Sequence, residues 1–147
     1  MLEARAGLPL GSMLHTLGRP CLSTNVGHKM ETADQISALV EDQLTRFKDA
    51  KSAARFRQLS VAPRAEDRDW DYGPLDQKYT CWVVFEHHES NVGIAYCSQG
   101  FGPRCPWGLL FLKGEKRILS MGMDSGWFSD LEDAFRDTWA YEALVKE

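Results

Sequence analysis

The segment from Gly100 to Gly108, called here the 100–108 loop, is the most constrained stretch of the sequence, with three glycines and two prolines. Glycine permits positive φ angles and proline fixes φ, so this composition predicts one specific backbone path. Phe101, Arg104 and Trp107 would project from that path, and aromatic residues with arginine are typical of interface hot spots. The alternative is a rigid connection between strands, in which Trp107 fills the core.

Phosphate binding and cysteine catalysis are the first chemistries to weigh for this loop. A P-loop requires Lys-Ser or Lys-Thr and a helix after its last glycine, whereas an apolar strand is predicted here. Cys105 follows Arg104, whose charge would lower a thiol pKa, and His87 or His88 could act as the base. No local signature joins these residues, so the sequence predicts no catalytic residue and favours a non-enzymatic protein.

Metal binding is the next possibility, because histidine and cysteine are zinc-type ligands. None of the four cysteines is spaced as a CxxC pair or a zinc ribbon. His87 and His88 are adjacent on a predicted strand and would point to opposite faces. The sequence therefore predicts no metal and no cofactor, and Cys81 and Cys97 are interpreted as inert core residues.

Acidic side chains gather in the turn-rich segment 63–78, where Trp70 and Tyr72 could pin the chain onto the body of the domain. The segment lacks the spacing of an EF-hand calcium loop. A solvated loop is the favoured interpretation, and an electrostatic docking surface for a basic partner is the alternative. The acidic residues are Glu66, Asp67, Asp69, Asp71 and Asp76.

A second shaped turn is predicted where Gly122 and Gly126 flank Asp124, ahead of a helix N-terminus that could attract an anion. Asp124 would oppose an anion and is better explained as a turn or cap residue. The candidate partner- or ligand-binding residues of the whole sequence are Trp70, Trp82, Phe101, Arg104, Trp107 and Asp124.

Two helical patterns must position these residues. One precedes the predicted strands in the sequence, and the other follows them. The first begins at the capping box Thr32–Gln35 and is predicted to run to about Phe56. Its apolar residues recur at the i, i+3, i+4 and i+7 spacing of one buried stripe. A second capping-box pattern at Ser129–Glu132 predicts a C-terminal helix.

Short strands are predicted at 58–62, 79–87, 92–98, 109–113 and 117–121. Alternation in 79–87 places Tyr79, Cys81, Val83 and Phe85 on one face and Trp82, Val84 and Glu86 on the other, which is typical of a central strand. We therefore predict the α+β class, with an N-terminal helix, a four- to five-stranded, mainly antiparallel meander sheet and a C-terminal helix, both helices on one face of the sheet.

The chain has 147 residues, enough for about one domain. Residues 1–29 show no apolar period and are predicted to be a disordered or non-domain leader, with an ordered arm as the alternative. Met1, Met13 and Met30 are each possible starts. A single domain is predicted over 30–147.

The formal net charge is −4. Three of the 17 basic and one of the 21 acidic residues lie in 1–29, so the remainder carries −6. This balance disfavours binding to nucleic acid or an anionic membrane. No apolar run reaches the ~18–20 residues that span a bilayer, and the N-terminus lacks a secretory layout. We expect a cytoplasmic protein with reduced thiols.

These observations predict a small, soluble, non-enzymatic interaction protein that acts on a protein partner, such as an inhibitor or immunity-type binding module. In size, charge and architecture the chain is similar to small bacterial α+β immunity proteins that neutralise toxins, although no specific motif carries that likeness. The alternative is a small-molecule-binding protein or enzyme with a pocket between the sheet and the 100–108 loop. Thiol or metal chemistry at Cys105 is the third hypothesis.

Overall fold

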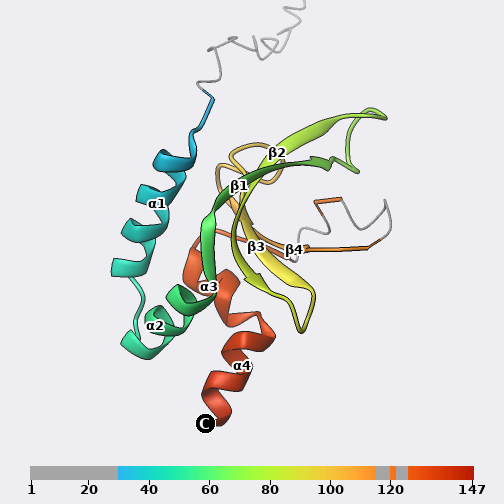
Figure 1. Ribbon diagram of the computed structural model, residues 1–147. Coiled ribbons are helices and arrows are strands. Elements are labelled where there is room, and N and C mark those ends of the chain that lie inside the picture. The colour runs from blue at the N-terminus through green and yellow to red at the C-terminus, as the bar shows by residue number, and fades with distance from the viewer. Residues whose placement is uncertain (1–29, 115–119, 122–125) are drawn as a thin grey trace, which may run out of the picture. The chain divides into compact units, whose positions relative to one another are not determined.

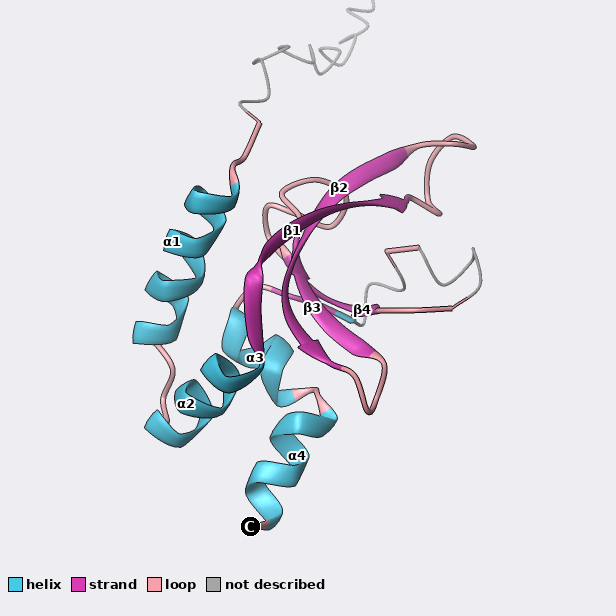
Figure 2. Cartoon of the chain, in the orientation of Figure 1, coloured by secondary structure: helices cyan, strands magenta, loops and turns pink. Residues whose placement is uncertain are grey.

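The computed structural model describes residues 30–114, 120–121 and 126–147. The chain divides into two units, Met1–Met30 and Glu31–Glu147, and every element below belongs to the second (Figures 1 and 2). The predicted leader 1–29 lies outside the described residues and stays a prediction. In chain order the elements are α1 (Ala33–Thr45), α2 (Ala50–Leu59), β1 (Ser60–Asp69), β2 (Lys78–His87), β3 (Val92–Tyr96), β4 (Trp107–Phe111), β5 (Trp127–Phe128), α3 (Leu131–Arg136) and α4 (Trp139–Lys146).

The predicted α+β class is confirmed, because helices flank a five-stranded antiparallel sheet in the sequence. The strand order is β1-β2-β3-β4-β5, so each strand pairs with its neighbour in the chain, as in the predicted meander. Among the described residues, no helix combines the length and apolar character needed to cross a bilayer.

The first helical pattern forms two helices, so the single helix predicted from Thr32 to Phe56 is wrong. The capping box at Thr32 is present, with Gln35 N–H donating to Thr32 Oγ1 at 3.3 Å. The chain then turns, and Asp49 caps α2 by accepting from the N–H groups of Lys51 and Ser52, both at 3.1 Å. An Asp side chain that satisfies these free amides starts a new helix.

The edge strand β1 continues through Pro63 into the segment that was predicted to be turn-rich. Pro63 lacks an N–H donor, and such a residue is tolerated on edge strands and at irregularities. Both conditions hold, since β1 lies at the edge of the sheet and its register with β2 shifts between Ser60 and Arg64. The predicted strand 58–62 was therefore too short.

At the other end of the sheet, the predicted strand 117–121 falls mostly outside the described residues. Ser120 is described, and it forms an isolated parallel bridge with Asp69. The fifth strand is instead β5, which pairs with β4 through Trp107↔Phe128 and Gly108↔Trp127. Trp107, predicted in the loop, is the first residue of β4.

An irregularity in strand β2 places one side chain on the face of the sheet opposite to the predicted one. Val83 pairs with Ala95 and Phe85 with Ile94, so two steps on β2 match one on β3. An extra residue of this kind changes which face the following side chains cover. Phe85 therefore packs on the helix side, opposite to the face predicted for it by simple alternation.

All helices cover the same face of the sheet, as predicted. The packing there is largely aromatic, with ring centroids 5.1 Å apart for Phe56 and Phe85 and 5.6 Å for Phe56 and Phe135. We call this the helix-side core. Its buried members are Ile36, Val40, Leu44, Phe56, Val84, Phe85, Ile94, Trp107, Leu131, Ala134, Phe135 and Ala140.

The C-terminal pattern also divides, into α3 and α4. Asp130 is the N-cap of α3, and the predicted capping box at Ser129 is not formed. The carboxylate of Glu132 instead accepts the N–H of Lys48 at 3.2 Å, which ties α3 to the turn between α1 and α2. Thr138 caps α4 by accepting from Tyr141 N–H.

The opposite face of the sheet holds a second apolar cluster, because the sheet curls strongly (Figure 2). Met121 N–H donates to Asp69 O at 3.1 Å, so the end of β1 meets the segment between β4 and β5. This curl encloses the second cluster, called here the inner core. Its buried members are Cys81, Val83, Ala95, Cys97, Leu110, Met121 and Trp127.

Candidate functional site

Five aromatic side chains come together at one end of the inner core, and we call them the aromatic cluster. Trp70 is central, with its ring centroid 5.1 Å from that of Tyr72, 5.6 Å from Tyr79 and 4.9 Å from Phe101. Phe101 also contacts Tyr72 at 5.6 Å and Trp127 at 5.7 Å. These separations fall within the 4.5–7 Å range of favourable aromatic pairs.

Trp70 and Tyr72 are held by a closed turn between β1 and β2. Trp70 N–H donates to Gln77 O at 2.8 Å, and Gln77 N–H donates to Pro74 O at 3.2 Å. The Gln77 amide also donates to the hydroxyl of Tyr79 at 2.7 Å. The turn is thereby fixed to β2 at the point where Tyr79 enters the cluster.

The 100–108 loop delivers Phe101 to the same place. Gly100 has φ of +64° and lies against Trp70 and Met121, a conformation that favours glycine. The loop is closed by Gly102 N–H donating to Gln99 O at 3.0 Å and Cys105 N–H to Phe101 O at 3.3 Å. Gly100 thus has the positive φ predicted for this loop and fixes a path that carries an aromatic side chain, whereas Gly108 lies in β4.

Trp127 forms the buried floor of the cluster. Its indole N–H donates to Met121 O at 2.6 Å, and only 4% of the residue is exposed. The indole lies directly against Gly108 on the paired strand, where a Cβ atom would overlap the ring. Gly108 is therefore required by this close approach between β4 and β5.

The outer edge of the cluster is open to solvent. Tyr72 is 58% exposed and the neighbouring Leu75 is 95% exposed, whereas Trp70 and Phe101 are half-buried. Large apolar side chains grouped at a surface mark interaction sites more often than single exposed residues do. The cluster therefore has a buried base and an accessible apolar rim.

Acidic residues lie in the chain segment that carries this rim. The segment 69–78 contains Asp69, Asp71 and Asp76 against one cation, Lys78, a net charge of −2. Lys78 pairs with Asp69, and this hydrogen bond raises the pKa of Lys78. Asp71 and Asp76 are exposed. The same segment lines a shallow pocket of about 330 Å³, which includes Trp70.

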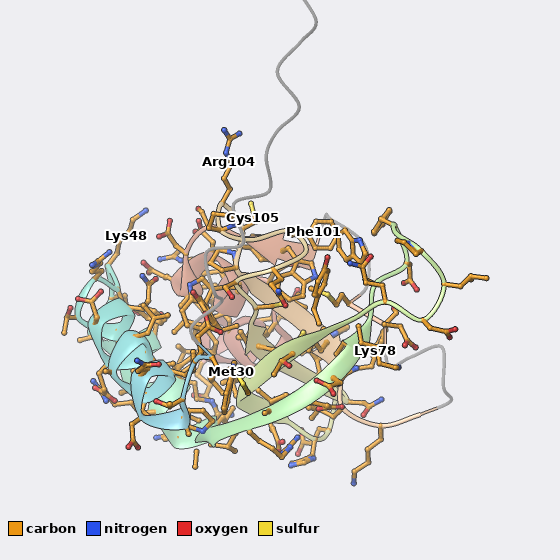
Figure 3. All side chains as sticks on the ribbon, turned by 90° about the horizontal axis from the view of Figure 1, so that it is seen from above. Met30, Lys48, Lys78, Phe101, Arg104 and Cys105 are labelled. Atoms are coloured by element: carbon orange, nitrogen blue, oxygen red, sulfur yellow. The ribbon has the colours of Figure 1, made fainter. Side chains whose placement is uncertain are left out.

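The predicted binding residues do not form one site. Trp70 and Phe101 meet in the aromatic cluster, but Trp82 and Trp107 pack on the helix-side core across the sheet. Trp107 is 1% exposed and fills that core, which was the alternative interpretation of the loop. Arg104 is exposed and points away from the ribbon (Figure 3). Asp124 lies outside the described residues.

Three members of the aromatic cluster were absent from the predicted binding set: Tyr72, Tyr79 and Trp127. Tyr72 carried a usable signal, since it lies two residues from Trp70 in an acidic turn and was expected to pin that turn. Tyr79 and Trp127 carried none, because their role depends on the curl that brings β1 and β2 toward β5.

The residues considered for cysteine catalysis lie at opposite ends of β3. His87 pairs with Val92 at the start of β3, whereas Cys105 belongs to the loop after Tyr96 at its end. His88 instead has Glu86 as its neighbour, at 3.0 Å. Within the described part of the chain, no group of three His, Cys, Asp or Glu side chains could hold a metal ion.

The small-molecule alternative placed a pocket between the sheet and the 100–108 loop. Two pockets among the described residues lie elsewhere, one along segment 69–78 and one of about 200 Å³ between the α1–α2 turn and the start of α3. Neither pocket favours the small-molecule alternative, which stays a prediction.

Comparison with known proteins returns no matching family model, curated protein or solved structure.

Proposed function

We propose that this protein is a non-enzymatic binding protein that docks a basic segment of a partner protein on the aromatic cluster. One observation carries the proposal: Tyr72 and Leu75 are 58% and 95% exposed beside the half-buried rings of Trp70 and Phe101. Tyrosine and tryptophan are enriched among the residues that dominate binding energy at interfaces.

The chemistry of the rim selects the class of partner. Aromatic faces attract lysine and arginine through cation–π contacts, and exposed Asp71 and Asp76 add complementary charge. The chain as a whole carries −4, which favours encounter with a basic surface. Arg104, exposed on the neighbouring loop, suits an acidic group at the edge of the same partner.

A role as an inhibitor or immunity-type protein fits this surface. Such a protein acts by occupying its partner and needs a preorganised patch rather than a catalytic group. The closed turn at 70–77 and the hydrogen-bonded 100–108 loop supply that preorganisation. Holding the rings in place before binding reduces the entropy lost on association.

The test uses the full chain as bait in a lysate of the native host, with Tyr72→Ala as the variant and Trp139→Ala as the matched control. Trp139 is also a large exposed aromatic residue, 64% accessible, but lies on α4. We expect one protein to be retained by the wild type and by Trp139→Ala and lost by Tyr72→Ala.

The purified partner is then titrated against each form of the bait at two salt concentrations. Tyr72→Ala is expected to weaken binding by at least about tenfold, as for an interface hot spot. Binding is also expected to weaken at higher salt, because the rim charges are solvent-exposed. Equal affinity of Tyr72→Ala and the wild type, or loss of binding only in Trp139→Ala, would rule the surface out.

A further inference from the structure

Cys81 and Cys97 face each other across adjacent strands, although 15 residues separate them in the sequence. The β2–β3 register pairs Trp82 with Tyr96 and Val83 with Ala95. One step further, the same antiparallel register places Cys81 opposite Cys97. The two side chains therefore project from directly opposed positions on the inner face of the sheet.

The hydrogen-bond pattern identifies the type of pair. Cys97 N–H donates to Pro106 O at 2.8 Å, toward the β4 side. The N–H and C=O of one strand residue point to the same side, so Cys97 directs neither group at Cys81. This makes Cys81 and Cys97 a non-hydrogen-bonded pair, in which the Cα atoms are about 4.5 Å apart and the side chains are closest. A disulfide accepts Cα separations of about 4.4–6.8 Å.

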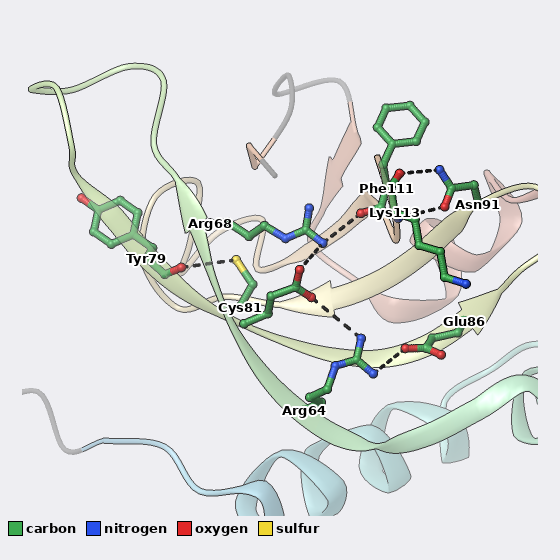
Figure 4. A network of polar contacts seen from close by, with 9 residues as sticks. Arg64, Arg68, Tyr79, Cys81, Glu86, Asn91, Phe111 and Lys113 are labelled. Atoms are coloured by element: carbon green, nitrogen blue, oxygen red, sulfur yellow. Dashed lines mark hydrogen bonds and ion pairs between the residues drawn. The ribbon is translucent and has the colours of Figure 1, made fainter. Parts of the chain in front are cut away.

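Both residues are fully buried in the inner core, where Cys81 Sγ also lies 3.8 Å from Tyr79 O (Figure 4). The hydrogen bond between the two thiols and burial raise the pKa of Cys81. The same hydrogen bond, with a second one from the backbone of Gln99, lowers the pKa of Cys97. The lower pKa favours Cys97 as the attacking thiol.

We propose that Cys81 and Cys97 are an oxidisable dithiol that hydrogen peroxide converts to a cross-strand disulfide. The thiolate of Cys97 attacks one peroxide oxygen, the O–O bond breaks, and the departing hydroxide takes up a proton to leave as water. Cys97 then carries a sulfenic acid. The sulfur of Cys81 attacks Cys97 Sγ, forming the S–S bond, and the S–O bond breaks. The hydroxide released takes the Cys81 proton, so two thiols lose two electrons and one peroxide becomes two waters.

Cys105 provides the internal comparison. It is half-buried and packs against the same inner core, but it belongs to the 100–108 loop and has no opposed position in the β2–β3 register. Exposure alone would favour oxidation of Cys105, whereas strand register favours the buried pair. The site of disulfide formation therefore separates the two explanations.

The experiment uses the full chain with Cys21→Ser and Cys105→Ser, which leaves only the opposed pair. The reduced protein is treated with hydrogen peroxide, quenched, denatured and alkylated, and its intact mass is measured. We expect a loss of two hydrogens and no alkylation after oxidation, against two alkylations before it. Adding Cys81→Ala to the same chain removes the partner thiol, and no intramolecular disulfide is expected.

Peptide mapping of the oxidised wild type provides a second measurement that does not depend on any variant folding. A cross-linked peptide that joins Cys81 to Cys97, reversed by dithiothreitol, is the expected result. The proposal is overturned if the pair keeps two alkylatable thiols while free Cys105 of the wild type is oxidised. It is equally overturned if the disulfide joins Cys105 to another cysteine or links two chains.

Discussion

Arg68 on β1 donates from Nη2 to the carbonyl oxygen of Phe111 on β4 at 2.9 Å, although β2 and β3 lie between these strands in the sheet (Figure 4). Arg68 is fully buried and also pairs with Glu66 at 2.9 Å. The contact spans the inside of the curl. It links the strand that leads into the 70–77 turn with the strand that follows the 100–108 loop, and both segments supply the aromatic cluster.

The first prediction concerns the replacement of Arg68. Arg68→Met keeps most of the apolar stem but leaves Phe111 O and the Glu66 carboxylate without this donor. We expect the free energy of unfolding to fall by about 1–3 kcal/mol, as for a lost buried partner. Urea unfolding of the variant and the wild type measures this. Arg57→Met is the control, since Arg57 and Glu41 form an ion pair that is half exposed, and it should cost less than about 1 kcal/mol. Equal losses in both variants would refute a special role for Arg68.

Trp107 should behave as a core residue. It is 1% exposed and its ring centroid is 5.1 Å from that of Tyr96. Trp107→Ala is expected to destabilise the protein by about 3–5 kcal/mol through cavity formation. Trp139→Ala on exposed α4 should change stability by less than about 0.5 kcal/mol. Thermal or urea unfolding compares the two, and a mild effect of Trp107→Ala would mean that the ring is not packed.

Gly108 is the next position, because a Cβ atom there would overlap the indole of Trp127. Gly108→Ala must displace either the ring or the backbone, and we expect a cost of about 1–3 kcal/mol, as for overpacking. Gly126→Ala is the matched control, since a Cβ atom at Gly126 meets nothing within 4 Å. Urea midpoints provide the measurement. Comparable stability of the two alanine variants would contradict the close contact between β4 and β5.

Asp49 gives a prediction with a pH dependence. The hydroxyl of Ser52 and the N–H of Lys51 donate to its carboxylate and lower the pKa of Asp49. A carboxyl whose pKa is lower in the folded state stabilises the fold above the unfolded value, about 3.9, and this contribution is lost as pH falls through the folded value.

Asp49→Ala should therefore lower the urea midpoint at pH 7, and the difference from the wild type should shrink below about pH 4. Asp49→Asn separates charge from hydrogen bonding, because asparagine also caps helices but does not titrate in this range. It should restore much of the midpoint, and its difference from Asp49→Ala should not change with pH in this range. A wild-type advantage that persisted unchanged in acid would exclude the carboxylate as its source.

The class of this fold could be predicted from local sequence patterns alone. Apolar periodicity depends only on which residues must leave water, so the helix stripes and the alternation in β2 and β3 were visible without a structure. The capping box at Thr32 was equally local. The glycines of the 100–108 loop predicted a specific backbone path, because glycine adopts conformations that other residues avoid.

The interruptions of helices and strands depend on contacts between segments that are distant in the sequence. The helix break at Asp49 was signalled by a capping residue, but Glu132, 83 residues later, also holds the preceding amide. The extra residue in β2 moved Phe85 to the helix side, which alternation could not reveal because both faces of that strand are apolar. Pro63 is tolerated because β1 is an edge strand whose register with β2 shifts at this point.

The site depended on the curl of the sheet even more directly. The predicted binding set grouped Trp82 and Trp107 with Phe101, because residue types alone do not show which side chains the sheet brings to the same face. The structure separates them: Trp107 packs under the helices, while Phe101 meets Trp70 on the inner side. Residue types showed which side chains could bind a partner. Only the long-range contacts of Arg68, Asp69 and Trp127, which no local pattern encodes, determined which of them share one surface.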